Sequence, residues 1–472
     1  MNWHKTTGVA ATAIGVLAGS YLAYSHLGYF SNVSFLGGVL LLQVVVVCLW
    51  NYAARFFPFV MIVFMWAGMN VPLQSTWTAG RWMVLAAGTG VGVVLWLRTP
   101  SPHFGTLHLV ALSCVSAAFV SASLSPYPKM AFLKALSLLL LFTYCSAGAR
   151  LAVFGRGIRF FQGLLLGCEI VVYGTAACYF VLGKQVWGNP NSLGAAMSIG
   201  VFPILLWGWR VSELAVLRRR RLIALLGCVY LIFFSGARAG MAAMVIVSLL
   251  FCFCLRQYRL MAQVTMLFLA LIAVKGVLGP ESLDKQAADA KDSILYKGHK
   301  AEGVLGSRKA PWEATMAGFR DHPYFGTGYG TSPTGEDPGA IAQFSSSAET
   351  SREHGSSYMT IAEWVGLIGV LPFALLLGTT AFNVGRVGVW LRRTPDPHHF
   401  AVPLAAVLVA GFVHAGFEDW LFAVGAYPCV FFWVFAFILN DLVPANAAVP
   451  VRQVVPGVPH RVTDWRTLAP NR

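Results

Sequence analysis

Residues 222–255, LIALLGCVYLIFFSGARAGMAAMVIVSLLFCFCL, form two apolar runs, 222–236 and 239–255, with a single charged residue, Arg238, between them. Runs of this kind recur along the 472-residue chain, in which 57% of residues are hydrophobic and only 11% are charged. Soluble domains carry about 25% charged residues, so the composition excludes a soluble globular protein. Apolar runs of this length are typical of membrane-spanning α-helices, whereas a β-barrel shows shorter segments of alternating polarity. The sequence therefore predicts an all-α, polytopic membrane helix bundle.

The apolar runs divide the chain into two membrane regions separated by one long polar loop. We expect about 12–14 transmembrane helices. The candidate spans are residues 8–30, 35–50, 56–70, 82–97, 106–122, 131–149, 160–182, 192–209, 222–236, 239–255, 260–279, 357–380, 400–415 and 420–440. The predicted regions are 1–279 with helices 1–11, 280–356 as a large outside loop with short helices, 357–443 with helices 12–14, and 444–472 as a cytoplasmic tail.

Basic residues in the short loops predict the orientation of the spans. With the N-terminus in the cytoplasm, one side of the membrane holds Lys5, Arg55, Arg98, Arg150, Arg156, Arg159, Arg210, Arg218 to Arg221, Arg256, Arg259, Arg386, Arg392 and Arg393. Short cytoplasmic loops are enriched in Lys and Arg, so the loop 280–356 is expected on the opposite, outer side. The net charge of +15 therefore indicates contact with anionic lipid headgroups rather than with nucleic acid.

Two arginines are candidates for anion binding. Arg238 lies at the outer end of a span, where it is either a fixed cation facing an outward cavity or a snorkelling interface residue. Arg308 precedes Pro311 and Trp312, and proline suits the first turn of a helix. A guanidinium near a helix N-terminus suits a phosphate, although an ordinary solvated arginine would show the same pattern.

The end of the long loop combines groups for phosphate contact and proton transfer. Arg352, Glu353 and His354 are consecutive, and Tyr358 follows at the start of the next span. Histidine is the usual general base near neutral pH, and a glutamate can replace it if its pKa is raised. The alternative is a polar helix cap formed by Ser356 or Ser357 and surrounded by solvated charges.

Further polar residues lie near the outer ends of spans or within them. Glu418 and Asp419, in the turn before the last span, either contact sugar hydroxyls and assist proton transfer or cap that span. Asn191 either caps a helix or binds a ligand. Glu169 lies inside the span 160–182, where an acid is either functional or hydrogen-bonded between helices.

Other common sites are absent from the sequence. None of the nine cysteines lies in the long polar loop, and no Cys-x-x-Cys pair or GxxxxGK[ST] motif occurs. The sequence therefore predicts no disulfide framework in the loop, no cysteine metal site and no P-loop for ATP.

Taken in order, the polar motifs resemble the O-antigen ligase and O-antigen or exopolysaccharide polymerase superfamily of bacterial inner-membrane glycosyltransferases. The motifs are Trp187-Gly-Asn-Pro-Asn-Ser-Leu-Gly194, Ser235-Gly-Ala-Arg238, Ser307-Arg-(x)3-Trp312, His322-Pro-Tyr-Phe-Gly-Thr-Gly-Tyr-Gly330 and His354-Gly-Ser-Ser-Tyr-(x)4-Glu363-x-x-Gly366-x-x-Gly369. The resemblance implies a GT-C-like bundle in the inner membrane with its active site facing the periplasm. It implies transfer of a glycan from undecaprenyl diphosphate to an acceptor hydroxyl, without a metal or other cofactor.

The resemblance also implies roles for particular residues. Arg238 and Arg308 match the family's diphosphate-binding arginines, with Arg352 beside them, and His354 is the nearest match to the loop histidine that acts at the acceptor. Glu353 is the alternative base. Contacts to the acceptor or the sugars are expected from Trp312, Asn191, Tyr358, Glu418 and Asp419.

His354 stands one position before the histidine of the ligase pattern, which falls on Gly355. This displacement favours a repeat-unit polymerase, with a ligase that uses lipid A core as acceptor as the alternative. The expected partners are the lipid-linked donor, a glycan or lipid A core acceptor, membrane lipids, and a chain-length regulator and flippase of the same pathway. A secondary transporter is the alternative from another class, because transporters share this hydropathy and place charged residues within the membrane.

Overall fold

The structure is a computed structural model that describes residues 51–98, 104–259, 261–262, 306–332, 353–394 and 396–444. These residues are α-helical apart from their connections, with one isolated β-bridge between Met69 and Trp187. The all-α prediction is therefore confirmed. The expected spans 8–30, 35–50 and 260–279, Arg352, most of the loop 280–356 and the tail from residue 445 lie outside the described residues.

The described helices follow the predicted order. A helix over Asn51–Ala67 is followed by α3 (Gln74–Arg98), α4 (Thr106–Ser123), α5 (Pro128–Tyr144), α6 (Arg150–Val153), α7 (Gly157–Ala176), α8 (Pro190–Ala195), α9 (Phe202–Val211), α10 (Ala215–Ser235), α11 (Arg238–Cys254), α14 (Gly306–Asp321), α15 (Ser357–Arg393), α16 (Ala401–Ala415) and α17 (Tyr427–Leu442). π-Helical turns join α5 to α6 and α8 to α9 without a loop.

Within the described residues, six helical segments are long and apolar enough to cross a membrane. They are Gln74–Arg98, Thr106–Ser123, Pro128–Val153, Gly157–Val181, Pro190–Val211 and Ser357–Arg393. Shorter apolar helices cover Asn51–Ala67, Arg238–Cys254, Ala401–Ala415 and Tyr427–Leu442. Large apolar side chains such as Leu97 and Val181 are exposed on the six long segments, as expected where the outer surface of the protein faces lipid. The protein is thus a multi-pass membrane protein.

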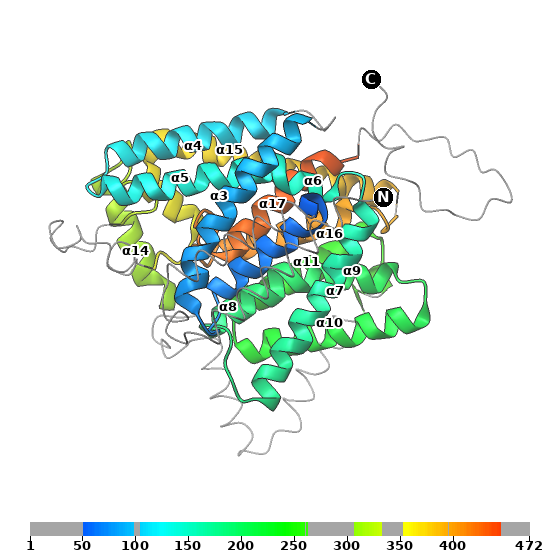
Figure 1. The fold of residues 1–472 in the computed structure, drawn as a ribbon. Coiled ribbons are helices and arrows are strands. Elements are labelled where there is room, and N and C mark those ends of the chain that lie inside the picture. Colours follow the sequence, from blue (N-terminus) through cyan, green and yellow to red (C-terminus); the bar gives the residue numbers. More distant parts are fainter. Residues whose placement is uncertain are drawn as a thin grey trace, which may run out of the picture.

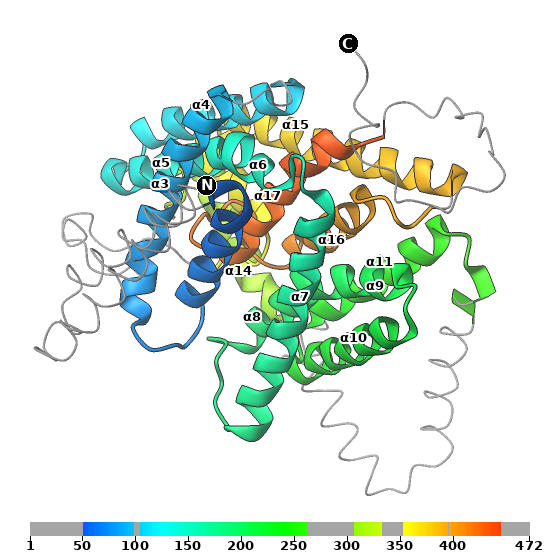
Figure 2. The ribbon, with the colours of Figure 1, turned by 45° about the vertical axis from the view of Figure 1, so that its right-hand side comes forward.

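The helices form two groups around a buried centre. Figures 1 and 2 show α3, α4 and α5 on one side, α7, α9, α10 and α11 on the other, and α16 and α17 between them. Most side chains of α17 are buried, including Trp433 and Phe435, so this helix forms the middle of the core.

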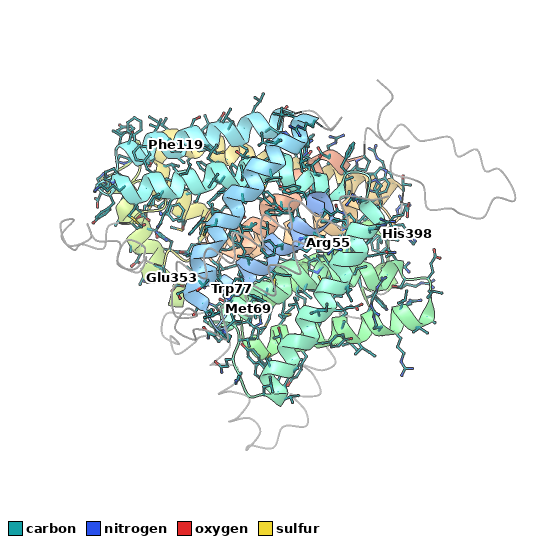
Figure 3. All side chains as sticks on the ribbon, in the orientation of Figure 1. Arg55, Met69, Trp77, Phe119, Glu353 and His398 are labelled. Atoms are coloured by element: carbon teal, nitrogen blue, oxygen red, sulfur yellow. The ribbon has the colours of Figure 1, made fainter. Side chains whose placement is uncertain are left out.

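The labelled residues mark two opposite ends of the bundle. In Figure 3, Glu353, Trp77 and Met69 lie toward one end, and Arg55 and His398 lie toward the other. Hydrogen bonds tie segments together at the second end, from Arg156 to Asn51 (3.1 Å) and from Trp207 to the carbonyl of Pro397 (2.7 Å).

Helix α15 is interrupted, which the sequence did not predict. Its 37 residues would extend about 55 Å as one straight helix, well beyond the ~30 Å hydrocarbon core. Gly366 breaks it with φ 65° and ψ −175°. The loop 322–332 packs into the break, where Thr327 N–H donates to the Glu363 carbonyl (2.9 Å) and Leu367 N–H donates to the Pro323 carbonyl (2.7 Å). The loop therefore forms hydrogen bonds with backbone N–H and C=O groups of α15 that lipid could not provide.

Three predicted boundaries are corrected. Pro311 lies inside α14, which begins earlier, at Gly306, so Arg308 belongs to the first turn of this helix. The last span begins at Tyr427, and residues 416–426 form a loop. Arg218 to Arg221 and the basic residues near Arg393 lie in the end turns of α10 and α15 rather than in loops, because charged ends extend these helices beyond their apolar parts.

Candidate active site

Arg308 of α14 is the centre of a cluster of charged residues from distant parts of the chain. Its Nη1 donates to Glu353 Oε1 (2.5 Å), and its Nη2 donates to Glu418 Oε1. Glu353 immediately precedes α15, and Glu418 lies in the loop 416–426. The Arg308 side chain is only 11% exposed. One guanidinium therefore joins three segments that are far apart in sequence.

Asn191 of α8 reaches the same cluster. Its Nδ2 donates to Glu418 Oε1 (3.0 Å). The helix cap that the sequence suggested for Asn191 is provided by Asn189 instead, whose side chain accepts from Ser192 N–H (2.7 Å). Asn191 is consequently available to position an acidic side chain.

Arg238 begins α11 directly beside α8. The two segments approach closely because a Cβ on Gly194 would lie 2.2 Å from the Cβ of Ala237. Arg238 is partly exposed, and it lies near enough to Arg308 for their like charges to repel. The structure therefore brings both arginines expected to bind an anion to one end of the bundle.

His354 is buried between two carboxylates. Its Nδ1 lies 3.1 Å from Asp419 Oδ2, which also accepts from the His354 backbone N–H (3.1 Å). Its Nε2 lies 2.7 Å from Ser332 Oγ and 3.3 Å from Glu363 Oε2. Both ring nitrogens are thus engaged, and the residue is fully buried.

Burial and charge shift the pKa values of this cluster in different directions. Burial acts to lower the pKa of His354, but hydrogen bonds and charges from Asp419 and Glu363 outweigh it and raise the pKa above 6.5. The pKa of Asp419 is lowered, because contacts with His354 outweigh the opposing effect of burial. Burial raises the pKa of Glu418, although Arg308 opposes this shift.

Gly355 and Trp312 fix the position of His354. Trp312 Nε1 donates to the Gly355 carbonyl (3.1 Å). Gly355 has φ +71°, and a Cβ there would lie 3.2 Å from both Arg308 Cδ and Trp312 Nε1. A histidine at position 355 would therefore be strained and crowded in this structure.

The loop 416–426 is attached to the start of α15. Both the backbone N–H and the hydroxyl of Ser357 donate to the Glu418 carbonyl, at 3.0 and 2.6 Å. Because α17 begins only at Tyr427, Glu418 and Asp419 do not cap it, as the alternative interpretation had expected. Ser356 is the residue before α15, and its side chain makes no capping hydrogen bond.

Two candidates from the sequence lie elsewhere. Tyr358 OH donates to the Phe412 carbonyl of α16 (2.7 Å) and is not part of the cluster. Glu169 pairs with Arg220 of α10 at 2.6 Å, so it forms an interhelical contact.

Ser332 and Glu363 were not selected as site residues from the sequence. Glu363 carried the same signal as Glu169, an acid inside an apolar span. Ser332 carried none, because a serine in a Gly- and Ser-rich loop is ordinary. Within the described residues, no group of three or more His, Cys, Asp and Glu side chains is arranged to hold a metal ion.

The comparison with known proteins matches a part of the chain that contains several residues of the cluster. Residues 222–374 match the family model described as O-antigen ligase. This range includes Arg238, Arg308, His354 and Glu363, whereas Asn191, Glu418 and Asp419 lie outside it. No curated protein matches the chain. The resemblance drawn from the motifs is therefore confirmed over residues 222–374, which are similar to the O-antigen ligase family.

Proposed function

We propose that this protein is a bacterial inner-membrane glycosyltransferase that moves a glycan from undecaprenyl diphosphate to an acceptor hydroxyl, and that it acts as a repeat-unit polymerase. One observation carries the proposal. Arg308 presents its two Nη groups to two anionic oxygens, close to a second arginine, in the part of the chain that matches the family. A planar guanidinium is well suited to the paired oxygens of a diphosphate.

The proposed chemistry needs stabilisation of the leaving group. A diphosphate leaves readily when its charge is neutralised, and fixed arginines provide that charge without reorganisation during the reaction. Arg308 and Arg238 are assigned to this role, and Arg352, outside the described residues, is expected beside them.

The reaction also needs a group that accepts the proton of the acceptor hydroxyl. His354 and Glu353, the two candidates from the sequence, both belong to the cluster. Glu353 is 62% exposed, whereas His354 is buried with both nitrogens engaged. These contacts support an exposed or partly exposed carboxylate as the base, with His354 positioning Asp419 and the segment before α15.

The remaining assignments follow from this placement. We propose that the cluster faces the periplasm, that the loop 280–356 covers the sugars, and that both termini are cytoplasmic. Trp312 and Asp419 are assigned to acceptor or sugar contacts. A chain-length regulator and a flippase of the same pathway are the proposed protein partners.

Three observations bear on the alternatives. The description of the matching family, O-antigen ligase, favours a ligase, whereas the displacement of His354 by one position favours a polymerase. For a transporter, the sequence offered Glu169 within the membrane, and this residue is paired with Arg220.

Reconstitution tests the proposal. The purified full-length protein in proteoliposomes receives an undecaprenyl-diphosphate-linked glycan together with either a second lipid-linked glycan or lipid A core. A polymerase yields a ladder of lengthened glycans without lipid A core. Transfer to lipid A core alone would identify a ligase, and no transfer to either acceptor would contradict the proposal.

Variants of Arg308 test in the same assay whether transfer depends on its guanidinium group. Arg308→Ala should abolish transfer, and Arg308→Lys should rescue it poorly, because an ammonium cannot reproduce the planar fork. Lys309→Ala is the matched control, since Lys309 is an exposed neighbour on α14. Full activity of Arg308→Lys would show that a planar donor is not needed there.

A further inference from the structure

Arg308, the side chain proposed to bind the donor diphosphate, already contacts two carboxylates of the protein. Glu353 and Glu418 each offer one oxygen to a different Nη of Arg308. Two phosphoryl groups of a diphosphate would present the same pattern of negative charge. A donor diphosphate must therefore compete with these side chains for Arg308.

The two carboxylates differ in what else holds them. Glu353 is 62% exposed, and among the described residues Arg308 is its only hydrogen-bond partner. Glu418 is 17% exposed and is also held by Asn191. Its backbone carbonyl is fixed by Ser357. If the contact with Arg308 were broken, Glu353 would enter the solvent, whereas Glu418 would still be held by Asn191.

We propose that the donor diphosphate displaces both carboxylates from Arg308, and that Glu418, retained by Asn191, is then the base that takes the proton of the acceptor hydroxyl. This inference rests on the proposed glycan transfer. Donor binding would thereby produce the base, so that the acceptor is activated only when a donor is present.

The proposed step is balanced. The acceptor oxygen forms a bond to the anomeric carbon, and the bond from that carbon to the diphosphate oxygen breaks. The diphosphate keeps the electron pair, and the hydroxyl proton moves to Glu418. Burial raises the pKa of Glu418 while Arg308 opposes the shift. Because a bound diphosphate offsets the charge of Arg308, it would weaken this opposition and make Glu418 a stronger base.

The test separates donor binding from transfer. Binding of undecaprenyl diphosphate to the purified full-length protein is measured for the wild type, Glu353→Gln, Glu418→Gln and the control Glu313→Gln, which changes an exposed carboxylate of α14. Removing a competing carboxylate should tighten binding, by about two- to fivefold for the exposed Glu353. Glu418→Gln should bind at least as tightly as the wild type and transfer glycan about 10²–10⁴-fold more slowly.

The outcomes distinguish this inference from the function on which it rests. Failure of the wild type to bind the lipid diphosphate would overturn the proposed function. If the wild type binds and transfers, then wild-type transfer by Glu418→Gln, or weaker donor binding by both variants, would overturn the inference alone. Retained donor binding also shows that a slow variant is folded.

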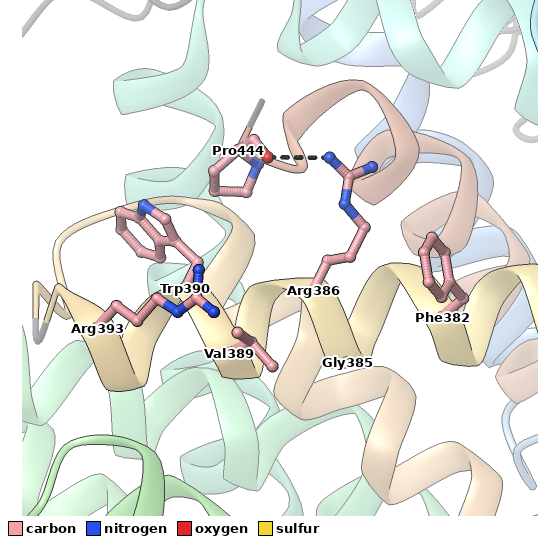
Figure 4. Close-up of a pocket in the computed structure, with 7 residues that line it drawn as sticks. All are labelled: Phe382, Gly385, Arg386, Val389, Trp390, Arg393 and Pro444. Carbon is pink, nitrogen blue, oxygen red and sulfur yellow. Dashed lines mark hydrogen bonds between the residues drawn. The ribbon is translucent and has the colours of Figure 1, made fainter. Parts of the chain in front are cut away.

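A second, independent observation lies at the other end of α15. A pocket there is lined by Phe382, Gly385, Arg386, Val389, Trp390, Arg393 and Pro444 (Figure 4). Residues 382, 386, 389 or 390, and 393 recur at helical spacing, so they share one face of α15. This face combines two guanidinium groups with aromatic and aliphatic side chains.

Within the part of the chain that the structure describes, the arginines of this pocket have no acidic partner. Arg386 donates to the Pro444 carbonyl (3.2 Å), and within the described residues neither Arg386 nor Arg393 forms an ion pair. The adjacent Arg392 differs, because its guanidinium lies over the Phe253 ring at 4.3 Å. Phe382 is 67% exposed and Val389 is 51% exposed, which provides an apolar wall on a membrane-spanning helix.

The geometry points to a binding site for an anionic phospholipid, with its phosphate at Arg386 and Arg393 and an acyl chain along Phe382 and Val389. Basic side chains at the end of a spanning helix attract anionic headgroups, and the neighbouring apolar side chains suit the lipid tail. This inference does not depend on the proposed glycan transfer.

Thermal stability in detergent tests the lipid site. Phosphatidylglycerol should raise the unfolding temperature of the full-length protein more than phosphatidylcholine does. The double variant Arg386→Gln/Arg393→Gln should lose most of this preference, whereas Arg392→Gln, which removes a neighbouring charge outside the pocket, should keep it. A preference that survives in the double variant, or equal stabilisation by inorganic phosphate alone, would overturn the site.

Discussion

His354 contacts carboxylates from two elements, Asp419 of the loop 416–426 and Glu363 of α15. Both carboxylates favour the charged imidazolium, and they outweigh the effect of burial on the pKa. Through its two ring nitrogens the residue joins the start of α15 to Ser332 and to the loop 416–426.

The contribution of His354 to stability should depend on pH. Because its pKa is raised on folding, the contribution is fully present below pH 6.5, the ordinary value, and is lost as pH rises through the raised pKa. Asp419 has a lowered pKa, so its contribution is present above its ordinary value of 3.8 and is lost as pH falls through the lowered one. Both contributions are therefore fully present between the ordinary pKa of Asp419, 3.8, and that of His354, 6.5.

Thermal unfolding of the wild type and His354→Gln in detergent, followed from about pH 5 to about pH 9, measures this effect. The difference between the two proteins should be largest in the acidic part of the range and should shrink at alkaline pH. A difference that stays constant across the range would show that His354 contributes through packing alone.

At the scale of elements, the break in α15 holds the candidate site together. The loop 322–332 packs against Gly366, and Ser332 of this loop contacts His354. Gly366 has φ +65°, and a Cβ there would lie 2.4 Å from the carbonyl carbon of Tyr324. Neither the conformation nor the space suits another residue.

Gly366→Ala should therefore destabilise the protein by at least about 2 kcal/mol, from backbone strain and overlap with the loop. Gly378→Ala is the matched control on the same helix, where a Cβ meets nothing within 4 Å. It should be neutral or stabilising by up to about 1 kcal/mol. Denaturant unfolding in detergent compares the two, and equal stabilities would show that the loop does not pack into the break.

At the scale of the whole molecule, a buried ion pair joins helices at the end opposite the candidate site. Arg150 Nε donates to Asp441 Oδ2 (2.5 Å), and its Nη1 lies 2.9 Å from His108 Nε2. The Arg150 guanidinium also lies over the Trp96 ring at 4.3 Å. These contacts connect α3, α4, α6 and α17.

Removal of one partner of this pair should be costly, because it leaves a buried charge without compensation. Arg150→Ala is expected to lose about 3–5 kcal/mol of stability, whereas the double variant Arg150→Met/Asp441→Leu should recover much of it. Thermal unfolding of the purified variants measures both. A double variant as unstable as Arg150→Ala would mean that packing of the arginine, rather than charge, dominates.

The proposed orientation predicts opposite accessibility of the two ends. A cysteine at Glu313, exposed on α14, should react with an impermeant thiol reagent in intact cells, whereas one at His398, exposed between α15 and α16, should react only after lysis. The wild type, whose described cysteines are buried or partly buried, provides the background. The reverse pattern would contradict the orientation.

The sequence by itself determined the helical membrane fold, because apolar runs and flanking charges are local properties that lipid selects directly. Most predicted spans between residues 56 and 255 agree with the helices to within a few residues, or to within about ten at charged ends. The motif order also predicted the family to which residues 222–374 are similar. It selected Arg308, His354 and Asp419, since ionisable groups beside spans are rare enough to stand out.

Only the tertiary structure decided how these residues are paired. Glu418 lies far along the chain from Arg308 and Asn191, and no local pattern predicts contacts between residues so distant in sequence. The break at Gly366 was equally invisible, because it depends on the loop 322–332 supplying hydrogen bonds to α15. Two charged side chains pair only when the packed helices bring them within contact distance, and the distance between residues far apart in the chain cannot be derived from local sequence.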